Sequence, residues 1–178
     1  MKGQDVVLML VLRLHPQDKW TLEELSRLLG QSTSQCFAAR NRLRDAHLLS
    51  IDPTKPWHVP GDNFAEYLIH GFKFDFPAKL GAPVRGMPTA YSSEFVSKQF
   101  RGDDSRMGGV VWPSPNGKVV GRSLSPVHSS QLNILANPGY DNLYRVLACM
   151  DLLRIGQARE KVWAAKEIEE AAYAEVAH

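Results

Sequence analysis

Hydrophobic positions in the first fifty residues recur with helical spacing, which predicts three helices. The run from Asp5 to Leu14 is apolar on most faces, so it is typical of a buried helix or a buried strand. Its leucines and methionine favour a helix, whereas its three valines weaken that preference. His15 ends the run because it precedes Pro16, and a residue before proline avoids the helical region.

The second predicted helix carries clear signals at both ends. Thr21 and Glu24 have the spacing of a capping box, in which the two residues satisfy each other's free backbone amides. Gly30 is placed to end the helix in a left-handed conformation. Four leucines between these ends form one apolar face: Leu22, Leu25, Leu28 and Leu29.

A third helix is predicted over residues 32–46. Ser32 and Gln35 give it a second capping box. Its apolar positions form a single stripe that consists of Cys36, Ala39, Leu43 and Ala46. The opposite face is polar and carries Asn41 and Arg42. We therefore expect one side of this helix to pack on the protein and the other to face solvent.

Short strands are predicted after the three helices. Leu48 to Ile51 and Trp57 to Val59 flank a proline-containing turn at 52–56, so they would form a small hairpin. The apolar positions of 63–72 again have helical spacing. The alternation of apolar and other residues over 71–77 predicts an edge strand.

The middle of the chain, residues 73–135, differs in composition. It contains six prolines and many glycines, which exclude a long helix. Residues 110–112 and 118–120 read as strands joined by a hairpin, since Asn116 precedes Gly117. The glycine-rich segment 100–109 is predicted to be a mobile loop.

Two helical segments complete the chain. Apolar residues from Leu143 to Leu153 have a spacing of three and four, and Gly156 interrupts the pattern. Residues 157–173 are rich in alanine, glutamate and lysine, which favour helices. We expect a helical hairpin or one long kinked helix here. The predicted fold class is α+β, with N-terminal helices, a β-containing middle and a C-terminal helical segment.

Composition narrows the class of protein. The 178 residues include 21 Lys+Arg and 19 Asp+Glu, and 44% are hydrophobic, which argues against intrinsic disorder. The longest apolar run is too short to cross a bilayer. Cys36 and Cys149 make no disulfide framework, so a reducing cytoplasm is the simplest location. The net charge of +2 neither demands nor excludes nucleic acid as a partner.

Residues 3–60 resemble a winged helix-turn-helix, as found in many bacterial transcription regulators. Three blocks carry the resemblance: Trp20 to Gly30, Ser32 to Cys36 and Arg40 to Leu49. His47 stands where such proteins often have glycine, and a left-handed residue is needed at that position. The resemblance implies that the helix over 32–46 enters the major groove of double-stranded DNA.

The resemblance also implies which side chains contact DNA. The candidates are Ser32, Thr33, Ser34, Gln35, Arg40, Asn41, Arg42, Arg44 and Lys55. Glutamine and asparagine pair well with adenine, and Arg42 could reach a guanine or a phosphate. Arg40 and Arg44 are better placed for phosphates. Lys55 is the one cation of the short turn that would form the wing.

The same resemblance suggests how the whole chain is organised. Residues 1–72 would be the DNA-binding domain, and residues 73–178 would dimerise, bind a partner or sense a ligand. The chain would then be a cytoplasmic transcriptional regulator, a homodimeric repressor rather than an enzyme. An antitoxin or adaptor whose main partner is a protein, with DNA binding secondary or absent, is the alternative, since more than half of the chain would not touch DNA.

A third possibility is an enzyme with its site in the middle region. Arg85 to Ala90 is predicted to be a rigid polar loop that could bind an anion, and a site there requires a deep polar pocket. The large aromatic residues could line a ligand pocket, although core packing explains them as well: Trp57, Trp112, Trp163, Phe95 and Phe100. The histidines lack the spacing of metal ligands, and no motif indicates a cofactor.

Overall fold

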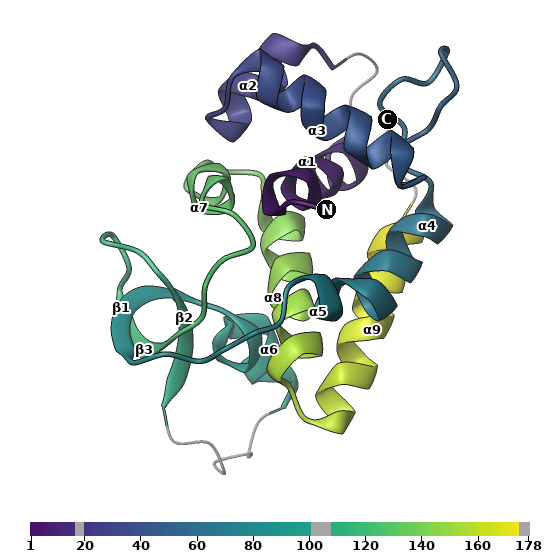
Figure 1. Ribbon diagram of the computed structural model, residues 1–178. Coiled ribbons are helices and arrows are strands. Elements are labelled where there is room, and N and C mark those ends of the chain that lie inside the picture. Colours follow the sequence, from purple (N-terminus) through teal and green to yellow (C-terminus); the bar gives the residue numbers. More distant parts are fainter. Residues whose placement is uncertain (17–19, 101–107, 175–178) are drawn as a thin grey trace.

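The computed structural model describes residues 1–16, 20–100 and 108–174. A small three-stranded sheet from the middle of the sequence lies to one side of the helices that both ends of the chain supply (Figure 1). The long C-terminal helix α8 (Asp141–Ile155) runs between the sheet and α9 (Ala158–Tyr173) (Figure 1). The predicted α+β class is confirmed.

The first element is a helix and not a strand. α1 (Gly3–Leu14) buries every side chain from Asp5 to Leu12, and each of these residues is at most 3% exposed. α3 (Thr33–Asp45) covers one side of α1, and α7 (Ser130–Leu135), α8 and α9 contact it as well. A helix enclosed in this way needs apolar residues on every face, which explains why its sequence shows no single stripe.

Both predicted capping boxes are confirmed. α2 (Leu22–Leu29) begins at Thr21, whose hydroxyl accepts the Glu24 N–H at 3.2 Å while the Glu24 carboxylate accepts the Thr21 N–H at 2.9 Å. Gly30 ends α2 with φ = 62°, the left-handed conformation expected of it. α3 (Thr33–Asp45) begins at Ser32, which exchanges the same pair of bonds with Gln35.

The segment after α3 turns back without forming strands. The prediction of strands at 48–51 and 57–59 is wrong, because a single backbone hydrogen bond, from the Ser50 N–H to the His58 carbonyl at 2.8 Å, joins the two segments. Pro53, Pro56 and Pro60 lie in the connecting turn and on both sides of the second segment, where their fixed φ restricts the chain. His47 does adopt the expected left-handed conformation, with φ = 57°.

The predicted helix at 63–72 is longer than expected. α4 (Gly61–Glu66), a π-helical turn η1 (Tyr67–Gly71) and α5 (Phe72–Asp75) follow one another without a break. The predicted edge strand over 71–77 is therefore wrong. Phe72 is buried, whereas Lys73 and Phe74 are exposed, so the apparent alternation arose from one turn of helix.

Three strands close into a small barrel: β1 (Pro83–Pro88), β2 (Gly109–Pro113) and β3 (Val119–Ser123). β1 is antiparallel to both partners, with Val84 opposite Gly121 of β3 and Met87 opposite Trp112 of β2. β2 and β3 are parallel to each other. The predicted hairpin between β2 and β3 is therefore wrong.

The turn between β2 and β3 explains the error. The Gly117 N–H donates to the Ser114 carbonyl at 3.0 Å, so Pro115 and Asn116 occupy the two central positions. The type I′ hairpin turn needs positive φ at both central residues, and proline has a fixed negative φ. The connection instead crosses over β1. There Gly117 and Gly86 meet so closely that a Cβ on Gly117 would lie 2.4 Å from the Gly86 backbone.

The segment from Arg85 to Ala90 is also not the loop that was predicted. Its first four residues belong to β1, and Arg85 projects from an exposed strand position. Ala90 then turns the chain with φ = 48° although it is fully buried. Two short helices follow, η2 (Ala90–Ser92) and α6 (Glu94–Gln99). The predicted loop at 100–109 lies largely outside the described residues.

The C-terminal part forms a helical hairpin, one of the two predicted arrangements. α7 (Ser130–Leu135) leads into α8 (Asp141–Ile155), and Gly156 separates α8 from α9 (Ala158–Tyr173). The two long helices lie side by side (Figure 1). One continuous hydrophobic cluster joins them to the N-terminal helices, and the Arg13 guanidinium donates to the Ala172 carbonyl at the far end of α9.

The large aromatic residues of the middle region are packing residues. Phe95, Trp112 and Tyr144 meet edge to face, and Phe100 contacts Trp163 in the same way. This arrangement supports the core-packing interpretation. Trp57 lies elsewhere, beside α3.

A buried polar cluster fastens the barrel to α8. The Asp151 carboxylate, which is 1% exposed, accepts hydrogen bonds of 2.8 Å from the Thr89 hydroxyl and from the Trp112 indole N–H. The Arg154 guanidinium lies 3.5 Å from its other oxygen. Burial raises the pKa of Asp151 to about 6, against the opposing effect of Arg154 and the two hydrogen bonds.

Candidate nucleic-acid interface

The third helix has one buried and one exposed face. Cys36, Ala39 and Leu43 are buried against the core, with at most 1% of each exposed. On the opposite side, one turn apart, the exposed positions form an outward stripe that we define as Ser34, Phe37, Asn41 and Asp45. Ala46, predicted to belong to the buried stripe, is exposed and follows the end of the helix.

The first turn of α3 uses two of the predicted contact residues for its own structure. The Gln35 side-chain oxygen accepts both the backbone N–H and the hydroxyl of Ser32. This leaves the Gln35 amide NH₂ as its free donor group. Thr33 and Ser34 are exposed beside them.

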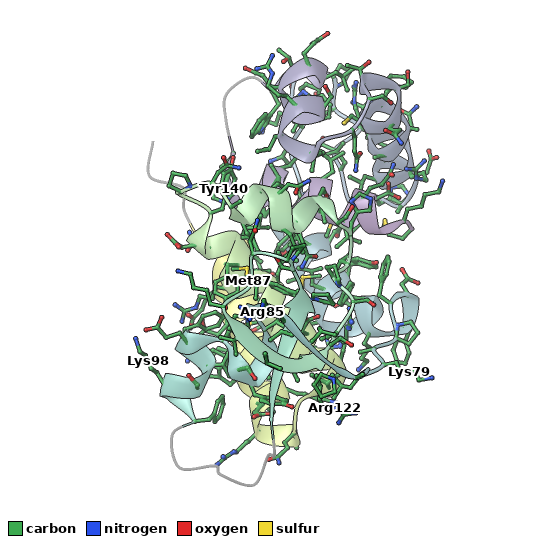
Figure 2. The ribbon with its side chains drawn as sticks, turned by 90° about the vertical axis from the view of Figure 1, so that its left-hand side faces the viewer. Lys79, Arg85, Met87, Lys98, Arg122 and Tyr140 are labelled. Carbon is green, nitrogen blue, oxygen red and sulfur yellow. The ribbon has the colours of Figure 1, made fainter. Side chains whose placement is uncertain are left out.

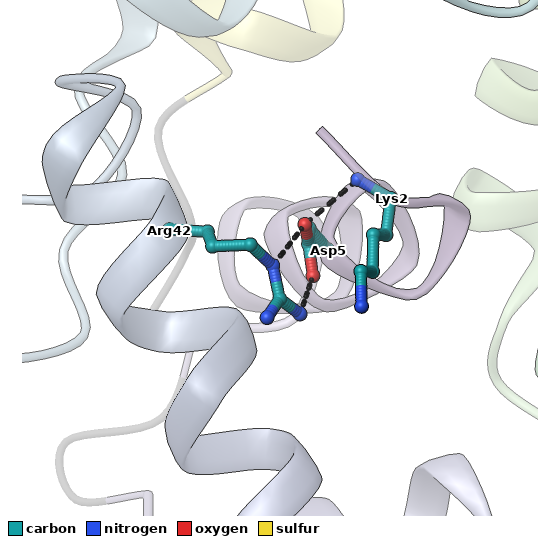
Figure 3. A network of polar contacts seen from close by, with 3 residues as sticks. All are labelled: Lys2, Asp5 and Arg42. Carbon is teal, nitrogen blue, oxygen red and sulfur yellow. Dashed lines mark hydrogen bonds and ion pairs between the residues drawn. The ribbon is translucent and has the colours of Figure 1, made fainter.

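Arg42 is held inside the fold. Its Nε and one terminal nitrogen donate to the two oxygens of Asp5, at 2.8 and 2.6 Å, and the Lys2 backbone N–H donates to the same carboxylate at 2.8 Å (Figure 3). Asp5 is fully buried, whereas the Arg42 side chain is 30% exposed. The bonds to Asp5 raise the pKa of Arg42.

This ion pair gives Arg42 a structural role that the sequence did not predict. A guanidinium that forms a bidentate pair with a buried carboxylate cannot also read a guanine without leaving that carboxylate unpaired. Arg42 therefore joins α3 to α1. The sequence already indicates that Asp5 needs a partner, because it begins an otherwise apolar run and a buried carboxylate must be paired.

Two further arginines lie on the side of α3 that faces the following turn. The Arg40 guanidinium stacks over the Trp57 ring at 4.9 Å from its centre. Burial and the nearby charge of Arg44 lower the pKa of Arg40. In the part of the chain that the structure describes, no carboxylate lies within ion-pair distance of Arg40 or Arg44. Sequence reasoning missed the role of Trp57, which no local pattern indicates.

Lys55 lies on the exposed turn that follows α3. The Asp52 side chain shapes this turn by accepting the Thr54 hydroxyl at 2.7 Å and the Thr54 N–H at 2.8 Å, and these two bonds lower the pKa of Asp52. The Lys55 N–H donates to the Asp52 carbonyl at 3.1 Å. Trp57, at the end of the same turn, lies against Arg40 of α3, and Lys55 and Trp57 line one cavity.

The possible enzyme site near Arg85 finds no support in the geometry. Arg85 is exposed on the outer face of β1 rather than set in a deep pocket. Among the described residues, no group of three or more histidine, cysteine, aspartate or glutamate side chains could hold a metal ion. Over the same residues, no helix is both long enough and apolar enough to span a membrane.

Comparisons with models of known protein families, with curated proteins and with solved structures found no match.

Proposed function

We propose that this protein is a DNA-binding transcriptional regulator that presents α3 to the major groove, in the manner of a winged helix-turn-helix, and that it acts as a dimer. One observation carries the proposal. Two capped helices are joined by a turn of three residues, and the second helix leaves its outward stripe free on the surface.

The polar and cationic side chains on and beside α3 have different roles in the proposal. Ser34 and Asn41 project from the outward stripe and would contact base edges. Arg40 and Arg44 lie on the flank, and since no described carboxylate pairs with them, they would neutralise phosphates. Arg42 would act as a positioning residue, because it sets α3 on α1 through Asp5. The turn that carries Lys55 has no strands, so it takes the place of a wing and reaches a phosphate at most.

The test is fluorescence anisotropy on the DNA upstream of the gene that encodes this chain, with scrambled DNA as the competitor. We expect saturable binding that prefers the upstream sequence and weakens steeply with salt, because bound phosphates release counterions. Asn41→Ala should weaken specific binding by about 1–3 kcal/mol. Asn142→Ala removes an exposed asparagine from α8 and serves as the matched control. Equal binding of both DNAs by the unaltered protein contradicts the proposal.

A protein-binding adaptor or antitoxin is the second candidate, and Phe37 favours it. This aromatic side chain is 48% exposed at the centre of the outward stripe, where an apolar anchor suits a protein partner. In a DNA complex, the same ring could contact a thymine methyl group. Co-purification of a neighbouring gene product at fixed stoichiometry, abolished by Phe37→Ala, would support the adaptor.

A further inference from the structure

The outer face of the barrel carries arginines that the strand register places next to each other. Arg85 of β1 lies opposite Val120 of β3, and Pro83 lies opposite Arg122. Residues two apart on a strand share a face, so Arg85 and Arg122 project from the same side as diagonal neighbours, roughly 7–8 Å apart. Both are exposed, and Val120 between them is 62% exposed.

Two lysines extend this group along the same surface. The Arg85 guanidinium lies 3.5 Å from the Gly117 carbonyl, beside exposed Lys118. At the other end, the segment that follows Lys79 runs next to the end of β3, because the Gly81 N–H donates to the Ser123 carbonyl at 2.9 Å. Figure 2 faces this side of the molecule, with Arg85 near the centre and Arg122 and Lys79 toward one edge. We call these four side chains the barrel cations.

Among the described residues, no carboxylate lies within ion-pair distance of the barrel cations. Over residues 76–100 and 108–128, which the structure describes, the one acidic residue is Glu94. Its carboxylate already pairs with Lys98 at 2.5 Å, and Lys98 lies on the opposite side of the view from Lys79 (Figure 2). Cations gathered without counter-charges repel one another, and an anionic partner relieves that repulsion.

We propose that the barrel cations form a second DNA-contacting surface, which binds the phosphate backbone. This inference rests on the proposed function, since it assumes that DNA is the partner of the chain. The contacts are of the kind that gives affinity without sequence preference, because flexible cationic side chains on an exposed face meet phosphates rather than base edges. The barrel would thereby strengthen binding, and α3 would select the sequence.

The salt dependence of binding gives the sharpest readout. Each neutralised phosphate adds about −0.9 to the slope of log affinity against log salt concentration on duplex DNA. Removal of two phosphate contacts should therefore make the slope shallower by about two. The ratio of affinities for specific and scrambled DNA should change little.

The experiment compares two doubly substituted proteins with the same change in net charge. One carries Arg85→Gln with Arg122→Gln. The control carries Lys73→Gln with Lys166→Gln, which removes exposed cations from α5 and α9. Anisotropy titrations on the upstream duplex at several salt concentrations should show at least a tenfold weaker affinity and the shallower slope for the first protein alone. A second pair, Lys79→Gln with Lys118→Gln, repeats the test with different residues.

The outcomes separate this inference from the proposed function. If both barrel pairs leave the affinity and the salt slope unchanged, the barrel inference is overturned. An equal loss in the control pair also overturns it, since overall charge then explains the effect. If the barrel pairs weaken binding while Asn41→Ala does not, the barrel surface stands and the proposed role of α3 fails. An unaltered protein that binds neither DNA overturns both.

Discussion

The Arg42 guanidinium and the Asp5 carboxylate form a bidentate ion pair that joins the exposed helix α3 to the buried helix α1. The pair lies at the boundary between solvent and core, with Asp5 fully buried and Arg42 partly exposed. A helix that must present a defined face to a partner gains from such an anchor, because the anchor fixes the rotation of the helix about its own axis.

Loss of Arg42 should affect folding before it affects binding. Arg42→Ala leaves the buried Asp5 carboxylate with the Lys2 amide alone, so the free energy of unfolding should fall by about 2–3 kcal/mol. Urea denaturation measures the change, and Arg42→Lys should recover part of it. Arg27→Ala, at an exposed position on α2, is the control. An Arg42→Ala protein of unchanged stability but lost DNA affinity would restore Arg42 to the contact residues.

Asp151 should make the protein less stable as the pH rises from about 4 to about 6. Its pKa is raised to about 6 in the folded state, above the ordinary aspartate value of 3.8, so the folded protein retains a proton that the unfolded chain has released. The contribution of this residue amounts to about 2–3 kcal/mol, because one pH unit corresponds to about 1.4 kcal/mol.

Urea denaturation at several pH values tests this dependence. Asp151→Asn keeps an oxygen that can accept bonds from Thr89 and Trp112 but cannot titrate. The difference in stability between the two proteins should therefore change across this interval and remain constant above it. If the difference in unfolding free energy between the two proteins does not depend on pH, Asp151 is ionised over this whole pH interval in the folded state.

The β2–β3 connection crosses over β1 at Gly86, and we expect that a methyl group at Gly86 would not be tolerated there. A Cβ at Gly86 would lie 2.1 Å from the Trp112 carbonyl oxygen, which belongs to the strand paired with it. We expect Gly86→Ala to destabilise the protein by about 2 kcal/mol or more, through overpacking against backbone. Asn116→Ala changes an exposed residue of the same connection and should have little effect on the midpoint of thermal unfolding. Equal midpoints for the two variants would mean that the barrel can open at this point.

Both cysteines should be unreactive in the native protein. Cys36 and Cys149 are buried free thiols, and burial raises the pKa of each, to about 12 for Cys149. A thiol-specific chromogenic reagent should detect no thiol before denaturant is added and two afterwards. Cys149→Ser should halve the final signal. A fast reaction of the native protein would place one of the thiols at the surface.

Local signals predicted the capped helices and the C-terminal helical hairpin correctly but missed the short helices α5, α6 and α7, and long-range pairing accounts for the errors in the strands. The caps at Thr21 and Ser32 depend on residues three positions apart, so the sequence contains all the information needed. The partners of β1 lie about thirty residues away, and no local pattern reports which of them it pairs with. The turn between β2 and β3 is instead centred on Pro115 and Asn116, where the fixed negative φ of proline excludes the type I′ hairpin turn.

In the candidate site, too, local spacing predicted some features, whereas others depend on long-range contacts. The outward stripe of α3 follows from helical spacing alone, and Asn41 lies on it as expected. The ion pair of Arg42 was not predicted, because its partner, Asp5, lies 37 positions earlier in the chain. The barrel cations were scattered in the sequence, and the register of β1 with β3 is what brings Arg85 and Arg122 together.

The enclosure of α1 has a consequence for experiments that divide the chain. Its side chains from Val6 to Leu12 are covered by α3 on one side and by α7, α8 and α9 on others. A fragment that ends near residue 72 would expose the part of α1 that the C-terminal helices cover, and such fragments aggregate or bind nonspecifically. We therefore expect the N-terminal helices not to fold as a separate unit. Function is better mapped by single substitutions in the intact chain than by deletion.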